Sequence, residues 1–171
     1  VLTSLGWVEL VACNDRSNYD LTRHSQISGK DLSILDNDSK IIPNVFEISM
    51  GVDRSLYSII EHCYSINDDR NLLSLKPGFS PIDVAIFPLV NKNDLPLLAL
   101  DIYNQLKLDF HAYYDSAGSI GRRYRRQDEI GTPVCITVDY DSITNNDVTF
   151  RYRDSMEQIR VPVDDIKLKL L

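Results

Sequence analysis

Alternating apolar and polar residues at positions 6–14 predict a first strand, which places Glu9 on the same face as Trp7. Glu9 is then either a surface residue at the strand end or a charge held in a cleft. The polar residues 14–17 predict a turn, and the following residues predict a helix over 18–27 that ends near a glycine. The polar run that follows this helix indicates an exposed loop or hairpin.

A second alternating segment, residues 44–51, predicts a strand with two different faces. The apolar face is expected in the core and consists of Phe46, Ile48 and Met50. The opposite face carries Glu47 and Ser49, about 7 Å apart along a strand. A carboxylate and a hydroxyl at that spacing could together bind an ammonium group.

A helix is expected directly after Gly51, because apolar residues recur there at helical spacing. The apolar stripe is Leu56, Ile59, Ile60, Cys63 and Tyr64. Arg54 falls in the first turn of this helix, where its charge opposes the helix dipole. Its position is unfavourable unless an anion lies nearby.

The polar, proline-containing stretch at 67–81 marks the expected domain boundary, which gives domains 1–76 and 77–171. Beyond it, strands and helices alternate, which favours a largely parallel sheet with right-handed crossovers. The expected elements are strand 82–90, helix 93–108, strand 110–115, a short basic helix, strand 133–140, hairpin 147–154 with 158–162, and a terminal helix 164–171.

The basic helix concentrates positive charge in an otherwise acidic chain. Four arginines, Arg122, Arg123, Arg125 and Arg126, fall within five positions around Tyr124. This indicates a surface that meets a polyanion. The four arginines span about one helical turn, so they cannot all face one ligand. One or two would contact the ligand, and the others would pair with Asp115, Asp128 or Glu129.

Composition is that of a globular protein, with 43% hydrophobic residues, 25% charged residues and a net charge of −7. No apolar run is long enough for a membrane span, and we expect no membrane partner. The chain begins at Val1, already within a strand-like pattern, so we expect a piece of a longer protein. The three cysteines are expected to be buried free thiols in a reducing compartment, and the histidines show no metal-ligand spacing with them. Phosphate-loop, dinucleotide and nucleophile-elbow motifs are absent.

Several segments resemble the glycyl-tRNA synthetases, a family of class II aminoacyl-tRNA synthetases. The first comprises Gly6-Trp7-Val8-Glu9 and residues 14–24, similar to the segment that leads towards motif 3. Residues 45–54 look like motif 3 itself, E-P-S-x-G-x-x-R, with Ile48 in place of the proline. Residues 118–124, 128–133 and 153–158 resemble the family's anticodon-binding domain.

The resemblance implies an α+β fold followed by an α/β fold. Residues 1–76 would be the C-terminal part of an antiparallel-sheet catalytic domain, with motif 3 at 45–54. Residues 77–171 would be a mixed five-stranded α/β anticodon-binding domain. Motifs 1 and 2 would lie before Val1, so this piece alone would not aminoacylate tRNA.

The resemblance also implies the site residues. Glycine would be held by Glu47, Ile48, Ser49 and Arg16. ATP would be bound by Glu9, Leu10 and Arg54, with Glu9 also meeting Mg²⁺. Arg54 and Glu47 would be catalytic, and the tRNA would be bound by Arg122, Arg123 and Arg125. A carboxylate suits an ammonium group, and arginine suits phosphate.

The implied activity is glycine–tRNA ligation in the cytoplasm by a homodimer, with glycine, ATP and glycine tRNA as partners and ATP and Mg²⁺ as cofactors. Two alternatives remain open. A non-catalytic nucleic-acid-binding relative, such as a polymerase accessory subunit, would be expected to lose Glu47, Ser49, Arg16 or Arg54. The other is an α/β interaction domain whose arginines form a solvated face, and composition alone favours it.

Overall fold

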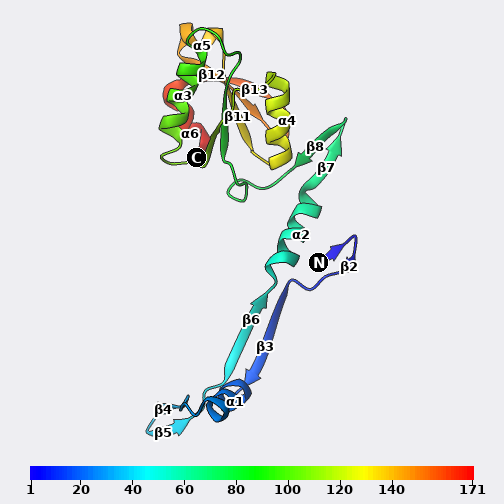
Figure 1. Cartoon of the computed structure of the whole chain (residues 1–171), viewed down its shortest axis with the longest axis vertical. Helices are drawn as coiled ribbons and strands as arrows, with labels where there is room; N and C mark the ends of the chain where they lie inside the picture. Colours follow the sequence, from blue (N-terminus) through cyan, green and yellow to red (C-terminus); the bar gives the residue numbers. More distant parts are fainter. The chain divides into compact units, whose positions relative to one another are not determined.

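The computed structural model describes all 171 residues, which divide into two compact units, 1–62 and 63–171. Figure 1 shows the elements of both units along the chain. This division falls earlier than the expected domain boundary at 76/77. The reason is that residues after Cys63 form a hairpin that packs on a helix of the C-terminal unit.

The N-terminal unit consists of three antiparallel two-stranded ribbons and two helices. Its elements are β1 (Leu2–Thr3), β2 (Gly6–Trp7), β3 (Val11–Ser17), α1 (Tyr19–Ser28), β4 (Ile34–Asp36), β5 (Ser39–Ile41), β6 (Val45–Met50) and α2 (Val52–Cys63). β1 pairs with β2, β3 with β6, and β4 with β5. The ribbon of β3 and β6 connects directly to both helices.

Two expectations for the start of the chain are wrong. The strand expected at 6–14 is interrupted, because Gly6 has a positive φ of 90° and a backbone hydrogen bond from Val8 closes the β1–β2 hairpin. Glu9 therefore lies in the connection to β3. The turn expected at 14–17 is instead strand, with a bulge near the end of β3.

The apolar face of β6 is open within the N-terminal unit. Phe46, Ile48 and Met50 are 66%, 69% and 62% exposed, although the alternation placed them in the core. The prediction fails because β6 belongs to a ribbon of only two strands, and nothing in the unit covers this face. The apolar stripe of α2 is likewise exposed at Leu56 and Ile60.

The C-terminal unit is built on one mixed five-stranded sheet in the order β10-β9-β11-β12-β13. Its elements are β7 (Tyr64–Asn67), β8 (Arg70–Leu73), β9 (Val84–Pro88), α3 (Leu95–Leu106), β10 (Ala112–Tyr114), α4 (Ile120–Ile130), β11 (Val134–Val138), α5 (Tyr140–Asn145), β12 (Asp147–Tyr152), β13 (Gln158–Pro162), a 3-10 turn (Val163–Asp165) and α6 (Ile166–Leu170). β10, β9 and β11 are parallel, and β12 and β13 add an antiparallel hairpin. The mixed five-stranded sheet is confirmed.

The sheet has a helical layer on each face. All five residues of β9 are buried, as the continuous apolar run predicted. Their side chains alternate between the two faces of the sheet. Val84 and Ile86 join the larger core under α3 and α6, whereas Ala85 and Phe87 join the smaller core under α4. Figure 1 shows α3 and α6 on the side of the sheet away from α4.

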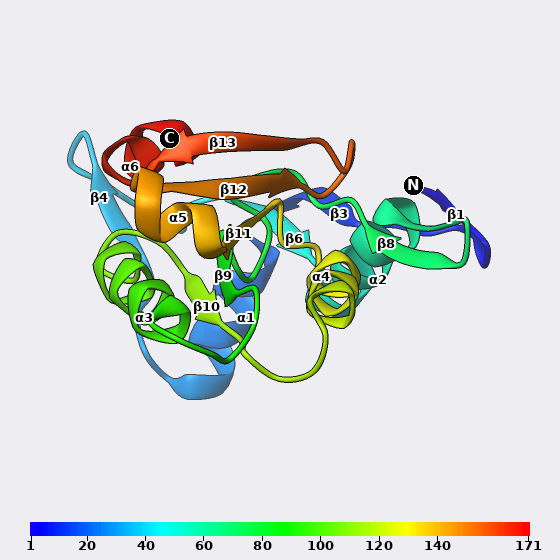
Figure 2. The same cartoon turned by 90° about the horizontal axis from the view of Figure 1, so that it is seen from above.

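The hairpin of β7 and β8 packs on α4 and lies beside it in Figure 2. Gly131, just after α4, makes this approach possible. Its φ is +93°, and a Cβ at this position would lie 2.9 Å from the backbone oxygen of Leu73. A larger residue would both strain the backbone and push the hairpin away.

No helix combines the length and the apolar character that a membrane crossing requires. The three cysteines are free, but only Cys135 is buried, whereas Cys13 is exposed and Cys63 is half-buried. The expectation of three buried thiols is therefore wrong. Burial raises the pKa of the Cys135 thiol to about 12.

Candidate functional site

The polar face of the β3–β6 ribbon presents Glu47 and Ser49 together. Asn14 pairs with Glu47 and Ala12 with Ser49 in the strand register, so these four side chains share one face. Asn14 Nδ2 donates to Glu47 Oε1 at 3.1 Å, and Oε2 makes no hydrogen bond within the protein. Ile48 lies between them on the opposite, apolar face.

Arg16 lies near this face at the bulge of β3, but its guanidinium is engaged elsewhere. Nε and Nη2 donate to the two carboxylate oxygens of Asp20 at 2.8 and 2.9 Å. The hydrogen bond from Arg16 lowers the pKa of the Asp20 carboxyl. An anionic ligand would have to share or replace Asp20 to reach Arg16.

Arg54 and Glu9 meet at the opposite end of the ribbon, at the start of α2. Arg54 Nη1 donates to the Glu9 carbonyl at 3.3 Å and lies 3.8 Å from Glu9 Oε1. The Leu10 carbonyl accepts from the Gly51 N–H at 3.3 Å, which ties the connection to the helix start. Glu9, Leu10 and Arg54 are thus brought together at the start of α2. The anion that faces Arg54 within this chain is Glu9.

No group of three or more histidine, cysteine, aspartate or glutamate side chains could hold a metal ion. Glu9 is a single carboxylate beside a guanidinium. It can supply one oxygen ligand to Mg²⁺ only if other oxygens come from a ligand, which is the usual arrangement for this ion.

The four clustered arginines of α4 occupy different environments. Arg123 is 2% exposed and donates to the carbonyls of Pro88, Leu89 and Asp115. The predicted contact between Arg123 and tRNA is therefore corrected: this guanidinium is used inside the fold.

Arg126 forms an ion pair with Asp115, with Nε 3.1 Å from Oδ2. Burial opposes ionisation of Asp115, but the Ala117 N–H and Arg126 outweigh it and lower the pKa of this carboxyl. Arg122 and Arg125 are exposed and form no ion pair or hydrogen bond within the chain. Two arginines therefore remain available to an external partner, as the helical geometry predicted.

A buried charge network connects α4 to the hairpin and to β12. Arg151 donates to both oxygens of Asp128 at 2.9 and 3.0 Å, and Arg70 Nε lies 3.1 Å from the same carboxylate without hydrogen-bond geometry. Sequence reasoning missed Arg70 and Arg151 because it assigned the first to the boundary between the domains and the second to the final hairpin. For Arg151, the available signal was an arginine within a segment that otherwise predicts a strand.

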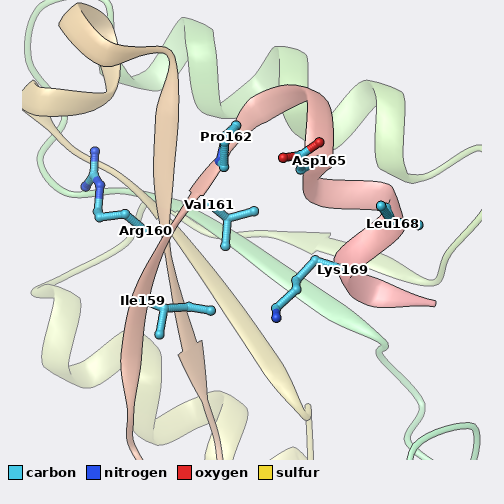
Figure 3. Close-up of a pocket in the computed structure, with 7 residues that line it drawn as sticks. All are labelled: Ile159, Arg160, Val161, Pro162, Asp165, Leu168 and Lys169. Atoms are coloured by element: carbon cyan, nitrogen blue, oxygen red, sulfur yellow. The ribbon is translucent and has the colours of Figure 1, made fainter.

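A shallow hollow between β13 and α6 is shown in Figure 3. Its sides are mainly apolar, from Ile159, Val161 and Leu168. Arg160 extends away from Lys169 in this view and pairs with Asp139 and Asp147. The hollow therefore offers few free polar groups.

The mixed sheet and the helices that cover its two faces, from β9 to α6, lie within residues 83–171. The family model described as "Anticodon binding domain" matches residues 83–171, and the chain belongs to this family. A solved structure with a similar fold is the RNA binding domain of threonyl-tRNA synthetase from Cryptosporidium parvum Iowa II. It has a TM-score of 0.52 and 19% identity, and the match covers 57% of this chain and 24% of that one.

Most of the chain, including most of the N-terminal unit, is similar to curated glycine–tRNA ligases. The relative from Treponema denticola is 48% identical over 92% of this chain, and the one from Clostridium kluyveri is 45% identical over 97%. The relative from Borrelia hermsii is 44% identical over 94%. The chain spans 37–38% of the length of these relatives.

Proposed function

We propose that the chain is the C-terminal part of a glycine–tRNA ligase. The observation that carries the proposal is the identity of 48% to one such ligase across 92% of the chain, which includes both units. Residues 1–76 would complete the catalytic domain, and residues 77–171 would bind the anticodon region of glycine tRNA.

Glycine would be bound at the polar face of the ribbon. One Glu47 oxygen is already oriented by Asn14, and the other would accept from the glycine ammonium group beside the Ser49 hydroxyl. The Ile48 backbone would line the same position. Arg16 would meet the glycine carboxylate or the adenylate after release from Asp20.

ATP would be bound where Glu9, Leu10 and Arg54 meet. A glycine carboxylate oxygen would attack the α-phosphorus of ATP, pyrophosphate would leave, and the hydroxyl at the tRNA 3′ end would then displace AMP from the glycyl carbonyl. Arg54 would stabilise the negative charge of the phosphates, and positioning supplies most of such catalysis. Mg²⁺ would neutralise phosphate charge, with Glu9 as one oxygen ligand. The enzyme would act as a cytoplasmic homodimer.

A non-catalytic relative that only binds nucleic acid, such as a polymerase accessory subunit, is the second candidate. It would not need the residues that bind glycine and ATP. Glu47, Ser49, Arg16 and Arg54 are all present, which supports the ligase.

Glycine-dependent exchange between ATP and pyrophosphate tests the proposal in the full-length protein. We expect exchange in the wild type and a loss of about 100-fold or more in Arg54→Ala, because a charge that stabilises the transition state is removed. Arg23→Ala, which removes an exposed arginine of α1, is the matched control and should retain wild-type exchange. No exchange in the wild type would favour the non-catalytic relative. Undiminished exchange in Arg54→Ala would remove Arg54 from the site.

A further inference from the structure

A second hollow in the C-terminal unit lies where three segments distant in sequence meet. The β7–β8 hairpin, α4 and the end of β12 line a space of about 370 Å³. This is near the lower end of the range for small-ligand sites, roughly 300–1,000 Å³. One of its sides, the hairpin, precedes residue 83 and so lies outside the matched anticodon-binding domain.

The deep side of the hollow is held in place by its own contacts. The Tyr124 hydroxyl lies 2.6 Å from Thr137 Oγ1, and the Arg151 guanidinium lies 4.7 Å from the Tyr124 ring centre. Arg151 is in turn fixed by Asp128. These side chains form a rigid surface and have little freedom to rearrange around a ligand.

The outer side carries polar groups that have no partner within the protein. They are the guanidinium of Arg125, the carboxylate of Asp68 and the amide of Asn67, and all three are exposed. Together they offer hydrogen-bond donors and acceptors on planar groups. Met156, which is 55% exposed, adds a polarizable surface at the same hollow.

The balance of charges in the hollow indicates whether its ligand is an uncharged base or a phosphate. The arginines that line the hollow, Arg70, Arg125 and Arg151, are matched by the aspartates Asp68, Asp128 and Asp154. A phosphate site would need an excess of positive charge, which this hollow lacks. An uncharged, planar group with donors and acceptors at its edge fits the available partners better, and unpaired RNA bases have this chemistry.

We propose that this hollow binds one unpaired base of the RNA, with Arg125 and Asp68 as the partners that recognise its edge. The inference rests on the proposed function, which makes tRNA the ligand of the C-terminal unit. It adds that the β7–β8 hairpin takes part in base discrimination together with the family domain. Asn67 lies beside Asp68 and contributes its amide to the same edge.

Binding of anticodon stem–loop RNAs to the full-length protein tests the inference. The probes are the stem–loop of glycine tRNA and a set in which each loop base is replaced in turn. In the wild type, replacement of one loop base should weaken binding roughly tenfold or more. In Asp68→Asn and Arg125→Gln, the same replacement should change affinity less than about threefold, because the base edge has lost its partner.

Substitutions at two residues near Asp68 and Arg125 serve as matched controls. Asp69→Asn changes the neighbouring turn carboxylate, and Arg122→Gln changes the other unpaired arginine of α4; neither residue lines the hollow. Both controls should keep the wild-type discrimination, even if Arg122→Gln weakens binding of every stem–loop equally. All substituted side chains are exposed, so folding should be preserved.

The outcomes separate this inference from the proposed function. If the wild type distinguishes loop bases and both Asp68→Asn and Arg125→Gln retain that discrimination, the hollow is not the base site, and the ligase proposal stands. The same holds if glycine tRNA binds but no loop base matters. If the wild type neither activates glycine nor prefers glycine tRNA, both proposals fail.

Discussion

Arg123 places a guanidinium at the carboxyl ends of β9 and β10, where the carbonyls of Pro88, Leu89 and Asp115 accept from it. The crossover helices α3 and α4 lie on opposite faces of the sheet, so this position is a topological switch point. Such points commonly form ligand crevices in α/β sheets. Here the protein fills the crevice with its own side chain, and burial lowers the pKa of Arg123. The crevice is consequently closed to an external ligand.

Replacement of Arg123 by alanine should therefore destabilise the C-terminal unit. We expect the free energy of unfolding to fall by about 3 kcal/mol or more, because several buried carbonyls lose their donor and a cavity remains. Urea unfolding measures this change. Arg122→Ala, the exposed neighbour, should remain within about 0.5 kcal/mol of the wild type. Equal effects in the two variants would contradict the structural role of Arg123.

The sequence limited how many arginines could be free but not which ones. Four arginines over one turn must face different directions, and this predicted that some would pair inside the protein. The pairing of Arg126 with Asp115 was within reach of that argument. The burial of Arg123 was not, because it depends on how α4 crosses the sheet, which local spacing does not determine.

Among the elements, the β7–β8 hairpin differs most from its expected role. Its polar, turn-like residues predicted a linker, yet Arg70 inserts between Asp128 of α4 and the carbonyl of Arg153. Composition describes the hairpin tip correctly, but it does not reveal the inward-facing arginine. The strands of the central sheet were more predictable, because their apolar runs are long and buried on both faces.

Asp128→Asn should release the hairpin from α4. The substitution keeps the shape of the side chain but leaves the buried Arg151 and the half-buried Arg70 without a carboxylate. Breaking a buried ion pair in this way costs roughly 3–5 kcal/mol. Hydrogen exchange of the amides in Tyr64–Asn67 and Arg70–Leu73 should become faster. Glu129→Gln, an exposed change on the same helix, serves as the control. Unchanged protection of the hairpin in Asp128→Asn would refute the role of this network.

On the scale of the whole molecule, the two units differ in how completely they bury apolar side chains. The C-terminal unit encloses a sheet between helices, whereas the N-terminal unit leaves Phe46, Ile48 and Met50 exposed. Their alternation correctly identified an apolar face. It could not show what covers that face, because burial depends on partners beyond the local pattern.

Acid should weaken the C-terminal unit through its paired carboxylates. For Asp139, burial opposes ionisation, but the Arg160 and Ser142 hydrogen bonds lower the pKa; for Asp154, the Arg153 hydrogen bond lowers it. The pKa of the Asp115 carboxyl is lowered as well. Because these pKa values are lowered, the folded state binds fewer protons than the unfolded state in this pH range. The stability that these carboxylates contribute is therefore present above pH 3.8, the ordinary pKa of an aspartate. It is lost as the pH falls through the lowered pKa values.

Hydrogen exchange of the β11 amides in the full-length protein, measured between neutral pH and pH 3 and corrected for intrinsic rates, should show this loss. Asp115→Asn should reduce the dependence on pH, because one titrating carboxylate is removed. Asp164→Asn, which removes an exposed and unpaired carboxylate, should leave the dependence unchanged. Protection that rises on acidification would contradict the sign of these shifts.

The hairpin that packs on α4 also has a consequence for how such proteins diverge. The residues matched by a domain family and the boundary of a compact unit need not coincide. Here the unit begins at Cys63, whereas the family match begins at residue 83. A lineage can change the tip residues Asp68 and Asp69 without disturbing any residue of the central core. Under the proposed role of Asp68 in base binding, substitutions in this short preceding segment would change RNA preference without changing the domain that carries the family name.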